Sequence, residues 1–125
     1  MSDGVTFVAE ALRQAGDAII AIDRDGIIRL WNEHAAVLFG RPEAEAVGQD
    51  VKIMIPERLQ DAHDEGFFTA MARGHLASDG RARRTKGVKG DGSTVFVTMT
   101  FAVINGADGE AIGAVAVARE YVREG

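Results

Sequence analysis

Apolar residues occupy every second position along one stretch in the second half of the chain. Between 94 and 104, apolar residues at 95, 97, 99, 101 and 103 alternate with a second set that includes three threonines. A period of two predicts a β-strand with one apolar face and one wetter face. We expect further strands over 81–89 and 111–121, because Asp-Gly pairs at 91–92 and 108–109 supply the tight turns of a meander.

The first half combines two short strands with helical patterns. Apolar runs at 18–22 and 27–31 flank Asp25-Gly26 and predict a hairpin. Helices are predicted over 33–39, 42–46 and 56–73, with a single turn at 50–54, and Pro42 and Pro56 mark two of the helix starts. An amphipathic helix over 5–14 precedes them. Two strands, several helices and then three strands predict an α+β fold whose sheet is covered by helices on its apolar side.

Composition narrows the possible functions. The chain has 125 residues, a formal net charge of −5 and no cysteine. One domain is expected, and a net acidic chain is a poor candidate for binding nucleic acid. The lack of cysteine excludes disulfides, thiolate metal sites and a cysteine–flavin adduct. Since no apolar run reaches a bilayer-spanning length and the start lacks a signal-peptide pattern, we expect no membrane segment and a cytoplasmic location.

The long helix carries the first candidate for chemistry. Residues four apart share a helix face, and one such row is apolar except for a histidine. Its members are Leu59, His63, Phe67 and Met71. His63 therefore lies in the apolar stripe, either as a partly buried histidine that hydrogen-bonds a neighbour or as a ligand to a cofactor.

The last three strands hold two further unusual features. In the strand at 81–89, Arg81 and Arg83 point to one side and Arg84 and Lys86 to the other. This strand is either a solvated edge, or one cation faces an internal polar group, because an unpaired buried charge is costly. Small residues over 112–118 permit close helix packing or leave room for a flat cofactor. Since no hydrolase, kinase or dehydrogenase constellation is present, we expect the chain not to be an enzyme.

Several short runs together resemble a PAS domain. They are Ile22-Asp23-Arg24-Asp25-Gly26-Ile27-Ile28, Trp31-Asn32, Leu38-Phe39-Gly40, Ala46-Val47-Gly48-Gln49, Lys89-Gly90-Asp91-Gly92-Ser93 and Val117-Ala118-Arg119-Glu120. The resemblance covers about residues 15 to 121. It implies a PAS fold, with a five-stranded antiparallel sheet flanked by helices on one face. The domain would span 16–122, after an N-terminal flanking helix at 1–15.

Among PAS domains, the chain is most similar to the haem-binding oxygen-sensor domain of the FixL family. His63 stands seven residues after Pro56 in an Ile-Pro-Glu segment, and Arg83 stands eight residues before Asp91-Gly92. The resemblance implies that His63 is the iron ligand of haem b and that Arg83 is the distal hydrogen-bond donor. It also implies that the cofactor contacts Phe67, Met99 and Phe101.

Two departures from that family's pattern concern the haem propionates. Family residues that contact these groups are replaced by Thr69 and Ala77 in this sequence. Arg73 and His75 lie close to these positions along the chain and are candidates to substitute for them.

The resemblance implies a sensory signalling module. It would bind a diatomic gas, oxygen first, on iron held by His63, and relay the change through the sheet and a homodimer interface. The output would be a downstream signalling domain or a partner protein. Two alternatives remain open at this point, namely a cofactor-free interaction module and a PAS domain that binds flavin or a small metabolite.

Overall fold

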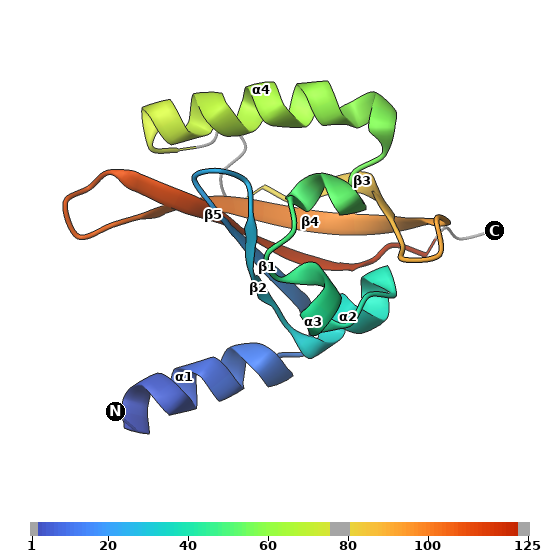
Figure 1. Ribbon diagram of the computed structural model, residues 1–125, viewed down its shortest axis with the longest axis horizontal. Coiled ribbons are helices and arrows are strands. Elements are labelled where there is room, and N and C mark those ends of the chain that lie inside the picture. The colour runs from blue at the N-terminus through green and yellow to red at the C-terminus, as the bar shows by residue number, and fades with distance from the viewer. Residues whose placement is uncertain (1–2, 76–80, 123–125) are drawn as a thin grey trace.

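A five-stranded antiparallel sheet forms the body of the protein. The computed structural model describes residues 3–75 and 81–122 and places the strands in the order β2-β1-β5-β4-β3 (Figure 1). The strands are β1 (Ala18–Asp23), β2 (Ile28–Trp31), β3 (Arg83–Val88), β4 (Thr94–Asn105) and β5 (Ala111–Glu120). The predicted α+β fold and its five-stranded antiparallel sheet are confirmed.

The helices before and between the strands also follow the prediction. They are α1 (Asp3–Gln14), α2 (Glu33–Phe39), α3 (Glu43–Ala46), the 3-10 turn η1 (Val51–Met54) and α4 (Glu57–Arg73). Figure 1 shows α4 lying along one side of the sheet, whereas α1 projects away from it at the opposite side. The largest difference from prediction is in β3, which begins at Arg83, two residues later than expected.

The core lies on one face of the sheet. Alternate residues of β1, β4 and β5 point to this inner face and are buried. They are Ala18, Ile20, Ile22, Val95, Val97, Met99, Ala116 and Ala118. Trp31 and Phe39, both fully buried, pack against each other at 5.6 Å between ring centroids. The other face carries the threonines of β4 and is wetter, as the alternation predicts.

Gly87 lets α2 pack closely against the edge strand β3. A Cβ atom at Gly87 would lie 2.5 Å from Cε1 of Phe39, closer than carbon atoms approach. The absence of a side chain therefore keeps Phe39 seated over the end of β3, which stays in register with β4 through the pair Gly87↔Val95.

Asn32 joins the N-terminal helix to the domain. Its side chain donates to the carbonyls of Leu12 and Asp17, at 2.9 and 3.0 Å, and accepts from the amides of Ile19 and Ala35, at 2.9 and 3.0 Å. All four hydrogen bonds available to a carboxamide are therefore made, as a polar group that is only 1% exposed requires. The end of α1, the start of β1 and the start of α2 consequently meet at one residue.

The apolar side of α1 is not covered by the domain. The helix has no buried residue, and Val5 and Val8 are 62% and 55% exposed. A hollow of about 620 Å³ runs along this side, lined by Gly4, Val5, Val8, Ala9 and Leu12. An amphipathic helix normally buries such a stripe, so this surface is available to another molecule.

Candidate functional site in the layer between α4 and the sheet

His63 lies on the side of α4 that carries the buried residues of this helix. Its side chain is 28% exposed, and its ring lies parallel to that of Phe67, at 6.1 Å between centroids and 6° between planes. Phe67 and Met71, one and two turns further on, are 7% and 5% exposed. The buried part of the predicted row is therefore Phe67 and Met71, and His63 lies with Leu59 in its less buried half.

The two sides of the imidazole have different surroundings. Nδ1 is enclosed and makes no hydrogen bond within the described part of the chain, and the Oδ1 atom of Asp64 lies 3.7 Å away, beyond hydrogen-bond distance. Burial lowers the pKa of His63, and the neighbouring Asp64 carboxylate opposes this effect only in part. The ring is therefore biased toward the neutral form, which is the form that can ligate a metal.

Three other residues of the predicted site share the layer under α4. Phe67, Met99 and Phe101 belong to one core cluster, with Met99 only 5% exposed and Phe101 partly buried. Met99 and Phe101 stand opposite Ala118 and Ala116 of β5. Alanine side chains are short. The part of the sheet beneath α4 therefore fills less of the space under the helix than larger side chains would.

Arg83 stands at the rim of this layer. It pairs with Met99 across β3 and β4, which places both side chains on the inner face, and it is exposed. Its guanidinium has no hydrogen-bond or ion-pair partner among the residues at 3–75 and 81–122. It is therefore a free cation beside the buried Met99.

The remaining cations of β3 explain why the sequence carries positive charge on both faces of this strand. Arg84 and Lys86 point to the outer face, where Arg84 lies 4.3 Å from the ring centroid of Tyr121 and Lys86 5.1 Å from that of Phe96. Each is a cation–π pair of ordinary geometry. The strand is thus a solvated edge on its outer face, and only Arg83 of these three faces the layer under α4.

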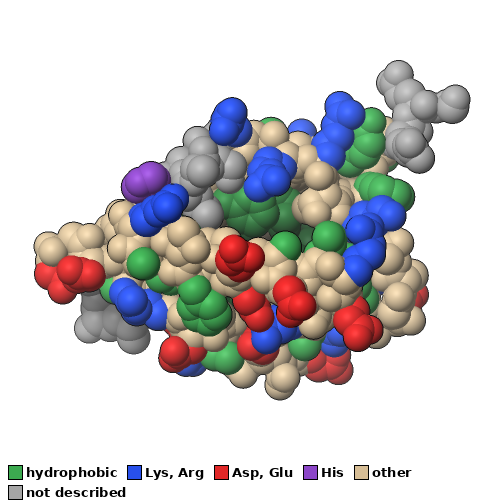
Figure 2. All heavy atoms as spheres, turned by 90° about the horizontal axis from the view of Figure 1, so that it is seen from above, with side chains coloured by type: hydrophobic (Ala, Val, Ile, Leu, Met, Phe, Trp, Pro, Cys, Tyr) green, Lys and Arg blue, Asp and Glu red, His purple; other side chains and the backbone are tan. Residues whose placement is uncertain are grey.

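The surface on this side of the molecule is hollowed. Seen from the side on which α4 lies in Figure 1, a depression near the centre has hydrophobic side chains at its bottom (Figure 2). Acidic side chains lie along one side of the depression, and Lys and Arg side chains stand around the other. Such a depression suits a ligand with an apolar body and anionic groups at its edge.

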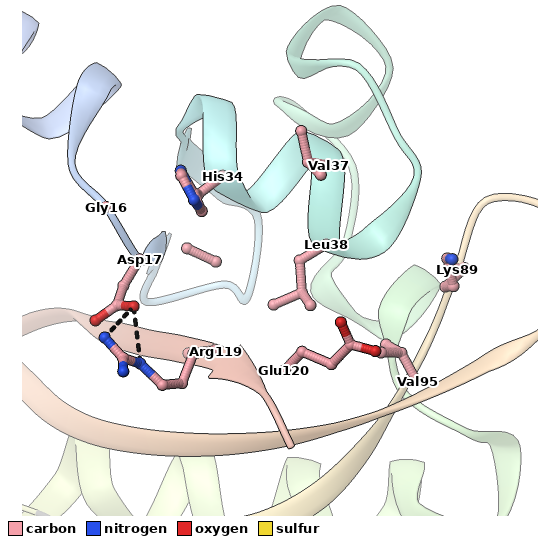
Figure 3. Close-up of a pocket in the computed structure, with 11 residues that line it drawn as sticks. Gly16, Asp17, His34, Val37, Leu38, Lys89, Val95, Arg119 and Glu120 are labelled. Atoms are coloured by element: carbon pink, nitrogen blue, oxygen red, sulfur yellow. Dashed lines mark hydrogen bonds and ion pairs between the residues drawn. The ribbon is translucent and has the colours of Figure 1, made fainter. Parts of the chain in front are cut away.

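A second hollow, of about 470 Å³, lies away from His63, where the chain enters β1 and leaves β5. Its polar lining includes Asp17, His34, Lys89 and Glu120 (Figure 3). Arg119 donates to Asp17 at 3.0 Å, so these two charges neutralise each other. Its floor of Ala18, Val95 and Ala118 continues the inner face of the sheet.

Among the described residues, those considered for contacts with haem propionates do not lie in the layer under α4. Thr69 is exposed, as are Arg73 and His75 at the end of α4, and Ala77 lies outside the described residues. Among the described residues, no three His, Cys, Asp or Glu side chains cluster as a metal site would require.

Sequence reasoning missed one member of this neighbourhood, Lys52. Its Nζ lies 3.1 Å from Oδ2 of Asp64, beside His63, although the two residues belong to different elements. No spacing rule connects a residue in η1 to one in α4, so only the folded arrangement reveals the contact.

The fold and this layer define a small domain built on one antiparallel sheet, whose inner face is covered by helices. The family model described as the PAS fold matches residues 6–120. The chain belongs to the PAS family. Within the described residues, no helix has both the length and the apolar character needed to cross a bilayer.

Two curated relatives are named as sensors. The chain is 38% identical over 91 residues to the sensor protein FixL of Bradyrhizobium diazoefficiens, a match that covers 71% of this chain and 18% of that protein. It is 26% identical over 104 residues to the oxygen sensor protein DosP of Escherichia coli, covering 83% and 13%. The chain therefore spans less than a fifth of the length of either relative.

Solved structures agree on the fold. A PAS domain from Colwellia psychrerythraea superposes with a TM-score of 0.79 at 22% identity, covering 95% of this chain and 98% of that one. An RNA-binding light-oxygen-voltage receptor gives a TM-score of 0.76 at 14% identity, covering 96% of this chain and 34% of that one. Identities this low establish a common fold and carry no argument about a common ligand.

The lowered pKa of His63 makes a prediction about acid stability. We expect the ligand-free protein to lose stability as the pH falls below 6.5, the ordinary value for histidine. In that range the unfolded chain binds a proton at this ring before the folded chain does, so the free energy of unfolding falls as the pH falls; above it, His63 contributes no pH dependence.

Urea denaturation between about pH 8 and about pH 5, of the natural chain and of His63→Gln, measures this effect. The variant should show the weaker decline on the acid side. Equal declines in both proteins, or an NMR titration midpoint of the His63 ring at or above 6.5, would contradict the assigned burial.

Proposed function

We propose that this chain is a haem-binding PAS sensor of a diatomic gas, with oxygen as the first candidate. The domain would span residues 16–122, with 1–15 as a flanking helix, and act in the cytoplasm. His63 would hold the iron of haem b through Nε2. Bound haem supplies the iron atom on which the gas binds.

The observation that carries the proposal is the position of His63. A neutral, largely covered imidazole next to an apolar layer is a suitable axial ligand for haem iron. Its enclosed Nδ1 faces the Asp64 carboxylate, and a ligating histidine commonly donates its second ring N–H to a carboxylate. Nε2 is then the nitrogen left for the metal.

The surroundings fit a porphyrin in two further respects. The alanines at 114, 116 and 118 keep the sheet low beneath α4, where a flat group would need space. The depression in Figure 2 is apolar at its bottom, with acidic side chains along one side and cationic side chains around the other, and the cationic side is where two carboxylates of a ring would be accommodated. Both curated relatives named above are sensors, and one is named an oxygen sensor.

Arg83 supplies a polar group on the far side of the proposed ligand. Its guanidinium is unpaired within the described residues and stands beside Met99, so it is free to donate a hydrogen bond to a bound gas. Occupied and empty states would then place this side chain differently. Since β3 is hydrogen-bonded to β4, a change at Arg83 would be transmitted to the sheet.

The first test of the function is haem binding. The chain loaded with haem should show a strong Soret band, and His63→Ala should abolish it because the axial ligand is lost. His34→Ala is the matched control: this histidine is exposed on α2 and its replacement should leave the spectrum unchanged.

Each other outcome of the haem titration refutes the proposal in a different way. A protein that stays colourless would indicate a cofactor-free interaction module, and one purified with flavin absorption would indicate a flavin-binding PAS domain. A Soret band that survives in His63→Ala would show that another residue holds the iron.

The second test concerns the gas. We expect Arg83→Ala to weaken oxygen binding by roughly tenfold or more, because a hydrogen bond from a charged donor is lost. Arg84→Ala, the neighbouring residue on the outer face, should leave oxygen binding unchanged. Oxygen dissociation kinetics of the ferrous protein measure both, and equal effects of the two variants would exclude the assigned role of Arg83.

The proposed output is a homodimer that relays the change to a downstream domain or partner protein. Two uncovered apolar surfaces support it. One is the exposed side of α1, and the other is the outer sheet face, where Phe96 and Val117 are 41% and 37% exposed. Exposed apolar stripes of this kind mark sites of association.

The dimer makes its own prediction. Val8→Glu, on the uncovered side of α1, should shift the protein from dimer to monomer, because a carboxylate would be buried in an apolar contact. Thr6→Glu adds the same charge on the polar side of the helix and should leave the dimer intact. Sedimentation equilibrium distinguishes the two, and a natural chain that is monomeric at high concentration contradicts the dimer itself.

A further inference from the structure

The carboxylate of Asp64 stands between two side chains from different elements. Its Oδ2 lies 3.1 Å from Nζ of Lys52 in η1, and its Oδ1 lies 3.7 Å from Nδ1 of His63 in α4. An ammonium group and an imidazole therefore share one carboxylate, with the carboxylate in the middle.

This arrangement is not what the helix alone would produce. Asp64 directly follows His63, and adjacent residues on a helix point about 100° apart, so their side chains do not ordinarily face each other. Asp64 is 33% exposed and could equally extend into solvent. The contact with Lys52, on the neighbouring element, provides the reason for it to stay beside the imidazole.

Lys52 is itself held in place by the backbone around it. Asp50 begins η1 by accepting a hydrogen bond from the amide of Lys52 at 2.9 Å. Gln60 of α4 donates to the carbonyls of Lys52 and Ile55, at 3.3 and 3.1 Å. The turn is thus fastened to the first part of α4, and the Lys52 side chain starts from a fixed position.

Electrostatics around the lysine favour the same contact. Asp64 raises the pKa of Lys52 most strongly, and Asp50 and Asp61 raise it further. The ammonium is therefore retained in this acidic neighbourhood, and its short contact is with Asp64.

We propose that Lys52 is a positioning residue for His63 and acts through Asp64. It keeps the negative charge of the Asp64 carboxylate beside Nδ1, at 3.7 Å, so that the proton is favoured on Nδ1 and Nε2 keeps a free electron pair. The consequence of this inference for iron binding rests on the proposed function. A carboxylate near the second ring nitrogen of a ligating histidine fixes the ring and increases its basicity as a ligand.

The direct test uses the ligand-free protein and requires no haem. In a ¹⁵N-histidine spectrum recorded above the pKa of His63, the natural chain should show this ring with Nδ1 protonated. Lys52→Met should shift the ring toward the form with Nε2 protonated, whereas Lys52→Arg should preserve the natural tautomer. Lys86→Met, which removes a lysine from the outer face of the sheet, is the control and should have no effect.

A second measurement tests whether the effect passes through Asp64. Haem affinity should fall about tenfold in Lys52→Met and in Asp64→Asn, which is the lower end of the usual effect of removing a partner of a metal-ligating histidine. The double variant should lose no more than Asp64→Asn alone, because both changes remove the same interaction. Full additivity of the two losses would contradict the relay.

The outcomes separate this inference from the function on which it rests. An unchanged tautomer and unchanged haem affinity in Lys52→Met would overturn the role of Lys52 and leave haem binding standing. A protein that binds no haem in any form would overturn the proposed function, while the ¹⁵N spectra would still decide whether Lys52 positions the ring.

Discussion

The functional site depends on one imidazole that is kept largely out of water. Desolvation disfavours a charged ring, so His63 is biased toward the neutral form, and the stacking on Phe67 limits its orientation. The nearest acidic group, Asp64, is itself engaged by Lys52 and does not restore the charge. A half-buried histidine that is biased toward the neutral form, with one nitrogen enclosed, is suited to the proposed binding of a ligand through the other nitrogen.

The sheet is organised around the same layer. Its inner face combines large side chains near α2, where Trp31 and Phe39 fill the core, with alanines along β5 where α4 crosses. Cations at the β3 edge are divided between the two faces: aromatic rings cover Arg84 and Lys86 outside, while Arg83 on the inner face has no partner in the described part of the chain. One face therefore lines the layer under α4, where we propose that a ligand binds, and the other face is the one we propose for association.

Most of the fold follows from the spacing of apolar residues and from the turn residues in the sequence. Alternation over 94–104 and the Asp-Gly turns predicted the meander, and the row with His63 and Phe67 predicted the inward side of α4. These features are local, which is why one sequence reveals them.

The contact of Lys52 with Asp64, and the four hydrogen bonds of Asn32, join segments whose separation in the chain has no fixed period. The start of β3 was predicted two residues early because Arg81 and Ala82 continue the strand-compatible pattern of the sequence but lie beyond the end of the ladder with β4.

The central claim is that His63 holds the iron of a bound haem, and resonance Raman spectroscopy of the ferrous protein tests it most directly. The account predicts an iron–histidine stretching band that shifts when histidine is labelled with ¹⁵N, disappears in His63→Gly and returns when imidazole is added to that variant. A band that persists unchanged in His63→Gly without imidazole, or its absence from the haem-loaded natural chain, would contradict the claim.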